Sequence, residues 1–119
     1  MTIFDKAEYS SCASSLPATT LHEQWGALVA KVGGKVYSVF HVDEDATTIA
    51  FKCPEETFEI LTSVEGVGQA PYFAKRQWVA VAGSASIPEE QLKDYLKASY
   101  SRVANSLTKK IQKEIGLTE

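Results

Sequence analysis

The side chains of this sequence best suited to binding chemistry stand together at positions 75 to 78. Lys75, Arg76 and Trp78 precede an apolar run in the stretch APYFAKRQWVAV. A guanidinium group binds phosphate or carboxylate through paired hydrogen bonds, and an indole ring can stack on a nucleic-acid base. Trp78 is therefore either a stacking platform or a core residue whose charged neighbours form a solvated rim. Because large aromatic side chains mostly pack inside proteins, the residues alone favour the core interpretation.

Lysines elsewhere in the chain extend this candidate site. If residues 75–78 are extended, Arg76 shares a face with Trp78 and can reach a phosphate or a carboxylate beside it. The functional interpretation puts all the cations on one sheet surface around the tryptophan. We therefore predict weak, salt-sensitive nucleic-acid binding through Lys31, Lys35, Lys52, Lys75, Arg76 and Trp78.

The charge of the whole chain argues against a protein that mainly coats nucleic acid. The net charge is −3 and the pI is about 5.4, whereas nucleic-acid affinity comes largely from neutralised phosphates. The distribution of charge along the chain argues less strongly against nucleic-acid binding, because residues 102–113 contain basic side chains and no acidic one. A local basic surface on an acidic body is compatible with both facts.

Cys53 is the thiol with the strongest claim to reactivity. It precedes Pro54 at an expected helix start, where free N–H groups lower a thiol pKa. No His–Asp arrangement accompanies it, so a small buried cap residue is the favoured interpretation.

His22 and His41 are potential metal ligands, with Glu23, Asp43 and Asp45 as oxygen partners. Their spacing matches no zinc or EF-hand pattern, so we expect neither a metal nor another cofactor. No acid, base and nucleophile set can be assembled, which predicts a non-enzymatic protein.

Elements expected in the first half are a helix and a meander of strands. The helix is predicted over residues 3–15, with Thr2 and Asp5 as a weak capping box and Pro17 as its stop. Strands are predicted at 20–22, 27–32 and 35–41, the last two joined by a Gly33-Gly34 hairpin turn. In residues 35–41, strict alternation separates Val36, Ser38 and Phe40 from Tyr37, Val39 and His41.

The second half is predicted to continue as turn, strand, helix, strand and helix. The run DEDAT turns the chain into a strand at 47–52, and Pro54 opens a short helix. A strand at 78–82 follows. Ser86 and Glu89 form a capping box, with Pro88 in the first turn of a last helix that ends in a basic tail. This order predicts an α+β domain with an antiparallel sheet packed with helices.

Composition sets the class of protein. The 119 residues, 45% of them hydrophobic, suit one domain covering residues 1–119. No run is long and apolar enough for a membrane span. The charged N-terminus does not resemble a signal peptide, and two cysteines are too few for a disulfide framework, so we expect a cytoplasmic protein.

Several motifs together resemble the MmcQ/YjbR family of small bacterial proteins. They are VGGKVYSVF at 32–40, FKCPEETFEIL at 51–61, PYFAKRQWVAV at 71–81 and SYSRVANSLTKK at 99–110. The motifs come in the family's order and cover most of the chain from about residue 20. The resemblance implies a two-layer α+β fold similar to secretion-chaperone-like and CyaY-like shapes. It also implies DNA binding, with Lys35, Lys52, Lys75, Arg76 and Trp78 in the shared motifs and no catalytic residue or cofactor.

The sequence also departs from the family pattern. Many relatives have a His and an Asn before the basic pair and a His before the Trp, where this chain has Tyr72, Phe73, Ala74 and Gln77. Any activity that needs those polar groups is in doubt here.

The leading hypothesis is a non-enzymatic binding domain for DNA. One alternative is a protein-interaction or chaperone-like module. The other is a small-molecule binder with a pocket near Trp25, Tyr72 and Trp78. Oligomeric state does not follow from the sequence.

Overall fold

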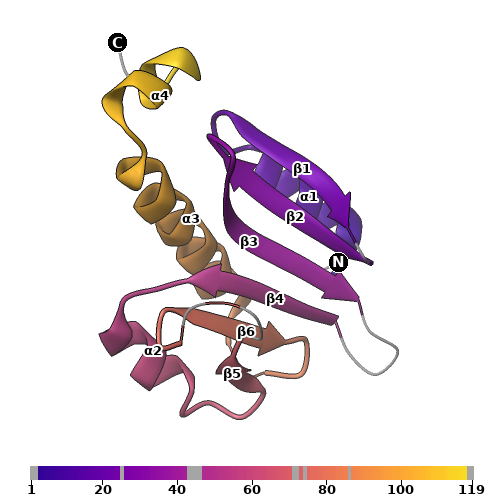
Figure 1. Cartoon of the computed structure of the whole chain (residues 1–119). Coiled ribbons are helices and arrows are strands. Elements are labelled where there is room, and N and C mark those ends of the chain that lie inside the picture. The colour runs from indigo at the N-terminus through magenta and orange to yellow at the C-terminus, as the bar shows by residue number, and fades with distance from the viewer. Residues whose placement is uncertain are drawn as a thin grey trace.

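A computed structural model gives the fold, and it describes residues 3–24, 26–42, 47–70, 73, 75–85 and 87–117. The elements are α1 (Lys6–Ser14), β1 (Thr19–Gln24), β2 (Ala27–Val32), β3 (Lys35–Val42), β4 (Thr47–Lys52), α2 (Glu55–Leu61), β5 (Val67–Gln69), β6 (Trp78–Ala82), α3 (Glu89–Ser106) and α4 (Lys109–Glu114). Six antiparallel strands form one sheet in the order β1-β2-β3-β4-β6-β5 (Figure 1). The α+β class and the antiparallel sheet predicted from the sequence are confirmed.

The helices pack on one face of this sheet. Figure 1 looks onto the other face, with α1 behind β1 and β2. Tyr9 of α1 contacts Phe40 of β3, with ring centroids 4.9 Å apart. Leu96 of α3 and Phe58 of α2 belong to the same buried cluster as that pair. The main hydrophobic core is therefore a single layer between the sheet and the helices.

Several helix boundaries differ from those predicted. Asp5 is itself the N-cap of α1, because its side chain accepts a hydrogen bond from the Ala7 N–H at 3.0 Å. The predicted start at residue 3 was therefore too early, and Thr2 lies outside the described residues. Helix α3 begins at Glu89 with Pro88 as N-cap, so Pro88 is not in its first turn, and Ser86 is also not described.

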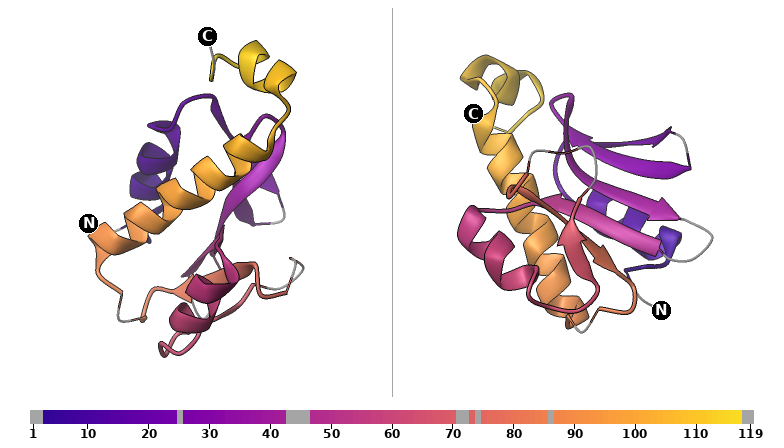
Figure 2. Two further views of the ribbon diagram at one scale, coloured as in Figure 1. Left: turned by 90° about the vertical axis from the view of Figure 1, so that its left-hand side faces the viewer. Right: turned by 60° about the horizontal axis from the view of Figure 1, so that its bottom comes forward.

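The C-terminal segment is a separate helix and not an irregular tail. Leu107 leaves the helical region at ψ 152, and Thr108 caps α4 by accepting a hydrogen bond from the Ile111 N–H. Both views in Figure 2 show α4 at the C-terminal end of the long helix α3. None of the described helices is long and apolar enough to span a bilayer.

Candidate functional site

The segment before β6 is a turn, so residues 75–78 do not have the extended arrangement in which Arg76 would share a face with Trp78. Arg76 has a φ of +63, in the left-handed region that side chains other than glycine seldom occupy. Its backbone N–H donates to the Gln69 side-chain oxygen at 2.9 Å, which anchors the turn to β5. The basic pair therefore projects from a loop.

Arg76 is engaged by acidic residues of α2. Its guanidinium group lies 2.8 Å from a Glu55 carboxylate oxygen and forms a second ion pair with Glu59. Hydrogen bonds to Glu55 and then to Glu59 raise the pKa of Arg76. The same group lies 5.9 Å from the centre of the Phe58 ring. Arg76 thus reaches carboxylates of its own chain, which compensate its charge.

Trp78 is a core residue, as the residues alone predicted. Its side chain is 6% exposed. The ring stacks on the Phe73 ring, with 4.1 Å between the ring centroids and 17° between the ring planes. It also packs beside Ala50 and Ala70 in a second, smaller buried cluster. The indole is therefore covered on one side by Phe73 and is not an exposed stacking platform.

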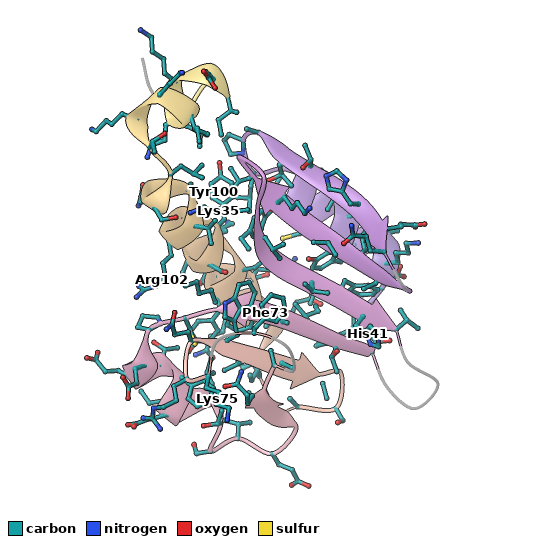
Figure 3. All side chains as sticks on the ribbon, viewed as in Figure 1. Lys35, His41, Phe73, Lys75, Tyr100 and Arg102 are labelled. Atoms are coloured by element: carbon teal, nitrogen blue, oxygen red, sulfur yellow. The ribbon has the colours of Figure 1, made fainter. Side chains whose placement is uncertain are left out.

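The lysines of the sequence-based site do not gather into one cluster. Lys35 lies at the β2–β3 turn, whereas Lys75 lies at the other end of the molecule, beside β5 (Figure 3). Lys31 lies at the same end of the β2–β3 hairpin as Lys35, since it pairs with Val36, and Lys52 lies on β4, where it pairs with Trp78. None of the four forms an ion pair within the part of the chain that the structure describes.

Neither cysteine has the environment of a nucleophile. Cys53 is 4% exposed, and Pro54 rather than Cys53 is the N-cap of α2. Burial raises the pKa of the Cys53 thiol, and the positive charge of Arg102 only partly opposes this. Burial likewise raises the pKa of Cys12. The shift expected of a reactive thiol is in the opposite direction.

The histidines do not come together as a metal site. The His22 ring lies 3.1 Å from the Thr20 hydroxyl, and His41 lies on the opposite side of β2, in β3. No group of three His, Cys, Asp or Glu residues suited to a metal occurs among the described residues. Asp43 and Asp45 are outside those residues, as are Trp25 and Tyr72 of the expected pocket.

A hollow lies on the sheet face opposite the helices, and we call it the sheet hollow. Its volume is about 670 Å³. The described lining residues are Gln24, Ala27, Val29, Val36, Val39, His41, Thr48, Ala50, Ala70, Phe73 and Ala80. All come from strands or from the loop before β6, and most are apolar. Phe73, near the middle of the sheet in Figure 3, forms a wall against Trp78.

A β-bulge in β3 shapes this hollow. Ala30 pairs with Ser38, but the next residue, Lys31, pairs with Val36, so Tyr37 has no partner across the β2–β3 ladder. Tyr37 and Ser38 are consequently both on the helix side, where Ser38 accepts a hydrogen bond from the Tyr9 hydroxyl at 2.8 Å. The strict alternation expected for 35–41 is therefore wrong.

The bulge adds an apolar side chain to the open face. Val36 and Val39, which strict alternation places on opposite faces, both line the sheet hollow. The sequence offered no clear signal for this, since the bulged residue is an ordinary tyrosine.

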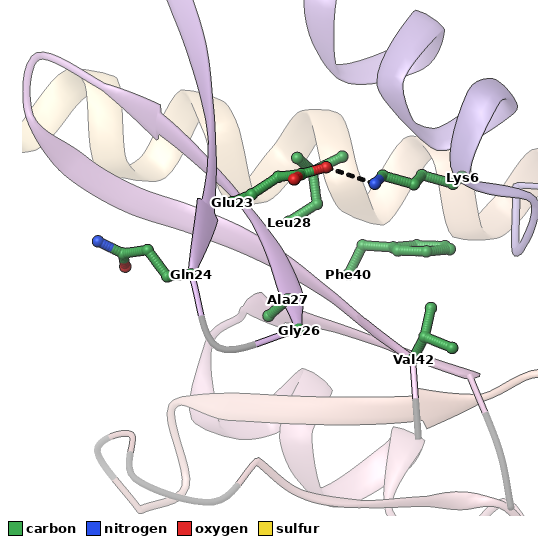
Figure 4. Close-up of a pocket in the computed structure, with 8 residues that line it drawn as sticks. All are labelled: Lys6, Glu23, Gln24, Gly26, Ala27, Leu28, Phe40 and Val42. Carbon is green, nitrogen blue, oxygen red and sulfur yellow. Dashed lines mark hydrogen bonds and ion pairs between the residues drawn. The ribbon is translucent and has the colours of Figure 1, made fainter. Parts of the chain in front are cut away.

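A smaller cavity of about 340 Å³ lies on the helix side at the β1–β2 end (Figure 4). Phe40 and Leu28 form its floor, and the Lys6–Glu23 ion pair crosses it. That pair joins α1 to β1, and the pKa of Glu23 is lowered by its hydrogen bond from Lys6. Because its charged groups are already paired, this cavity offers less to a ligand than the sheet hollow.

The sequence profile of the YjbR family matches residues 14–102. The chain belongs to the YjbR family. This confirms the resemblance carried by the four motifs, and no curated protein sequence matches the chain.

Solved structures share the fold of this YjbR protein. The Deinococcus radiodurans protein DR2400, with a DUF419 domain, has a TM-score of 0.82 and 25% sequence identity over 95% of this chain and 88% of its own. A Pseudomonas syringae protein has a TM-score of 0.69 and 15% identity over 83% of this chain and 98% of its own. The two-layer arrangement is thus found in other solved proteins.

Proposed function

We propose that this YjbR protein is a non-enzymatic binding module whose ligand site is the sheet hollow. The observation that carries the proposal is an apolar concavity of about 670 Å³ on a sheet face that no described helix covers. Ligand sites are typically clefts of roughly 300–1,000 Å³, lined by apolar side chains with a few polar groups. Gln24, His41 and Thr48 are the polar groups here. This supports the small-molecule hypothesis, with the site on the strands and beside Phe73, which stacks on Trp78.

An uncharged apolar dye, N-phenyl-1-naphthylamine, tests the proposal directly. We expect saturable binding at one site per chain, measured by dye fluorescence. Val39→Phe should weaken binding by about tenfold or more, equivalent to ~1.4 kcal/mol, because the larger side chain fills the hollow. Phenylalanine is also favoured in strands, so the sheet should tolerate the change.

Val42→Phe is the matched control, since it makes the same change on the same strand. Val42 is 54% exposed and lines the smaller cavity instead. Dye binding should be unchanged in this variant. Equal binding by wild type and Val39→Phe would overturn the proposed site.

Nucleic-acid binding is a second candidate. The observation in its favour is that Lys31, Lys35, Lys52 and Lys75 form no ion pair among the described residues. Its support is weaker than that of the sheet hollow, because Arg76 already pairs with Glu55 and Glu59.

A further inference from the structure

The open sheet face changes in character along the strands. Directly paired residues of neighbouring strands point to the same face, so the ladder defines rows of side chains across it. At one end of the hollow, the pairs Gln24–Ala27, Ala27–His41 and His41–Thr48 form a row with polar, uncharged side chains such as Gln24 and Thr48. The next row is apolar.

From β2 to β6, that apolar row consists of Val29, Val39, Ala50 and Ala80, which are paired in turn across β2, β3, β4 and β6. On β1, His22 pairs with Val29 and ends the row. It forms the middle of the sheet hollow. A ligand seated there therefore has an apolar body in contact with the centre of the sheet.

Lysines stand at the opposite end. Lys31 pairs with Val36, and Val36 lines the hollow. Lys52 follows Ala50 by two residues on β4 and pairs with Trp78, so it shares the face of both. Both lysines are partly exposed. Their strands lie on either side of β3. The pairing of β3 with β4 ends at Ser38–Phe51, so at the level of Lys52 these two strands are no longer joined by the ladder.

The two ammonium groups are available to a ligand. Among the ion pairs of the described residues, none involves Lys31 or Lys52. Two glutamates of α2, Glu55 and Glu59, are ion-paired with Arg76. A lysine stem lies along apolar surface while its charged head stays in water, which brings the charge to the rim of the hollow.

We propose that the sheet hollow selects small amphipathic organic anions, with the apolar body over Val39 and Ala50 and the anionic group between Lys31 and Lys52. This inference rests on the proposed function and adds the ligand's chemical class. An ammonium group attracts a carboxylate, sulfonate or phosphate as a point charge and imposes little geometry on it. Two cations beside a short apolar hollow match one anionic head better than a long polyanion, and the net charge of −3 opposes a long polyanion further.

Two dyes that share one ring system provide the test. 1-Anilinonaphthalene-8-sulfonate carries a sulfonate that N-phenyl-1-naphthylamine lacks. We expect the wild-type protein to bind the sulfonate more tightly. The double variant Lys31→Met/Lys52→Met should bind the sulfonate about tenfold more weakly and the uncharged dye almost unchanged. Added salt should weaken only the sulfonate complex.

Lys97→Met is the matched control, because it removes one charge from an exposed position of α3, in the helix layer. It should leave both affinities unchanged, and Lys31→Arg/Lys52→Arg should retain sulfonate binding. Equal losses in Lys97→Met and in the double methionine variant would overturn the inference, as would equal affinity for the two dyes. If neither dye binds, the proposed function fails as well.

A competition experiment separates this ligand class from nucleic acid. Decanoate should displace the bound sulfonate. Displacement by a short single-stranded oligonucleotide but not by decanoate would overturn the assignment to small anions.

Discussion

Ser99 joins α3 to the sheet at the point where β3 and β4 separate. Its hydroxyl donates to the Tyr37 carbonyl at 2.6 Å and accepts from the Lys52 N–H at 2.9 Å. The side chain is fully buried. Beside it, the Tyr100 hydroxyl donates to the Pro17 carbonyl at 2.5 Å. Ser99 thus fastens α3 to the strand that carries Lys52, and Tyr100 fastens it to the loop between α1 and β1.

Ser99→Ala should therefore lower the free energy of unfolding by about 1–3 kcal/mol, because it leaves the partly buried Lys52 N–H without its acceptor. Urea denaturation followed by circular dichroism measures the change. Ser101→Ala on the exposed side of the same helix corrects for helix propensity and should stay within roughly 0.5 kcal/mol of wild type. Equal stability of the two variants would contradict the role given to Ser99.

At the scale of elements, the β2–β3 hairpin docks on the junction between α3 and α4. Gly33 and Gly34 form its turn with φ values of +59 and +82. A Cβ atom at Gly33 would lie 2.6 Å from Leu107 Cδ1 and 3.2 Å from Ile111 Cγ2, whereas one at Gly34 would meet nothing within 4 Å. The backbone conformation favours glycine at both positions, but only Gly33 is also required by its packing against Leu107 and Ile111.

The two glycines provide an internally controlled prediction. Both Gly33→Ala and Gly34→Ala should cost about 1–2 kcal/mol from the left-handed backbone conformation. Gly33→Ala should cost more, because its methyl group displaces Leu107 from the turn. Thermal denaturation of both variants measures the difference. A Gly33→Ala protein as stable as Gly34→Ala would show that the α3–α4 junction does not pack on the hairpin.

Elements with a clear local pattern were predictable from the sequence, and elements set by tertiary contacts were not. Strands β2, β4 and β6 have the predicted bounds, since each is an apolar run ended by glycine or proline signals. Strand β5 was missed because it has only three residues, one of them Gly68. Helix α4 was taken for a basic tail, although Thr108 is a recognisable N-cap.

The candidate site was the harder part. Side-chain type led to the prediction of Lys31 and Lys52, which the proposed anion site retains. It did not reveal the ion-pair partners of Arg76 or the burial of Trp78. Glu55 and Glu59 are far from Arg76 in sequence and meet it only in the folded chain. The sheet hollow depends on the β3 bulge, which shifts Val36 onto the face of Val39 and which no periodicity reveals.

At the scale of the whole molecule, the two sheet faces are unequal. One carries the helices and the main core, and the other carries the sheet hollow and a small buried cluster around Trp78. The lysines are not gathered in one region, because Lys35 and Lys75 lie at different ends of the molecule (Figure 3). A polyanion would have to extend from one end of the molecule to the other to contact both.

The nucleic-acid candidate therefore makes a limited prediction about salt dependence. Each phosphate contact in duplex DNA contributes about −0.9 to the slope of log affinity against log salt concentration. Binding through the four unpaired lysines should give a slope no steeper than about −4, and Lys75→Ala should reduce it by about 1 uniformly across sequences. Fluorescence anisotropy with duplex and single-stranded oligonucleotides at low salt measures this, with Lys97→Ala as the control in the helix layer. Charge screening is weakest at low salt, so absence of any anisotropy change there would remove nucleic acid from the candidate ligands. Lys31 and Lys52 would then remain for a smaller anion at the sheet hollow.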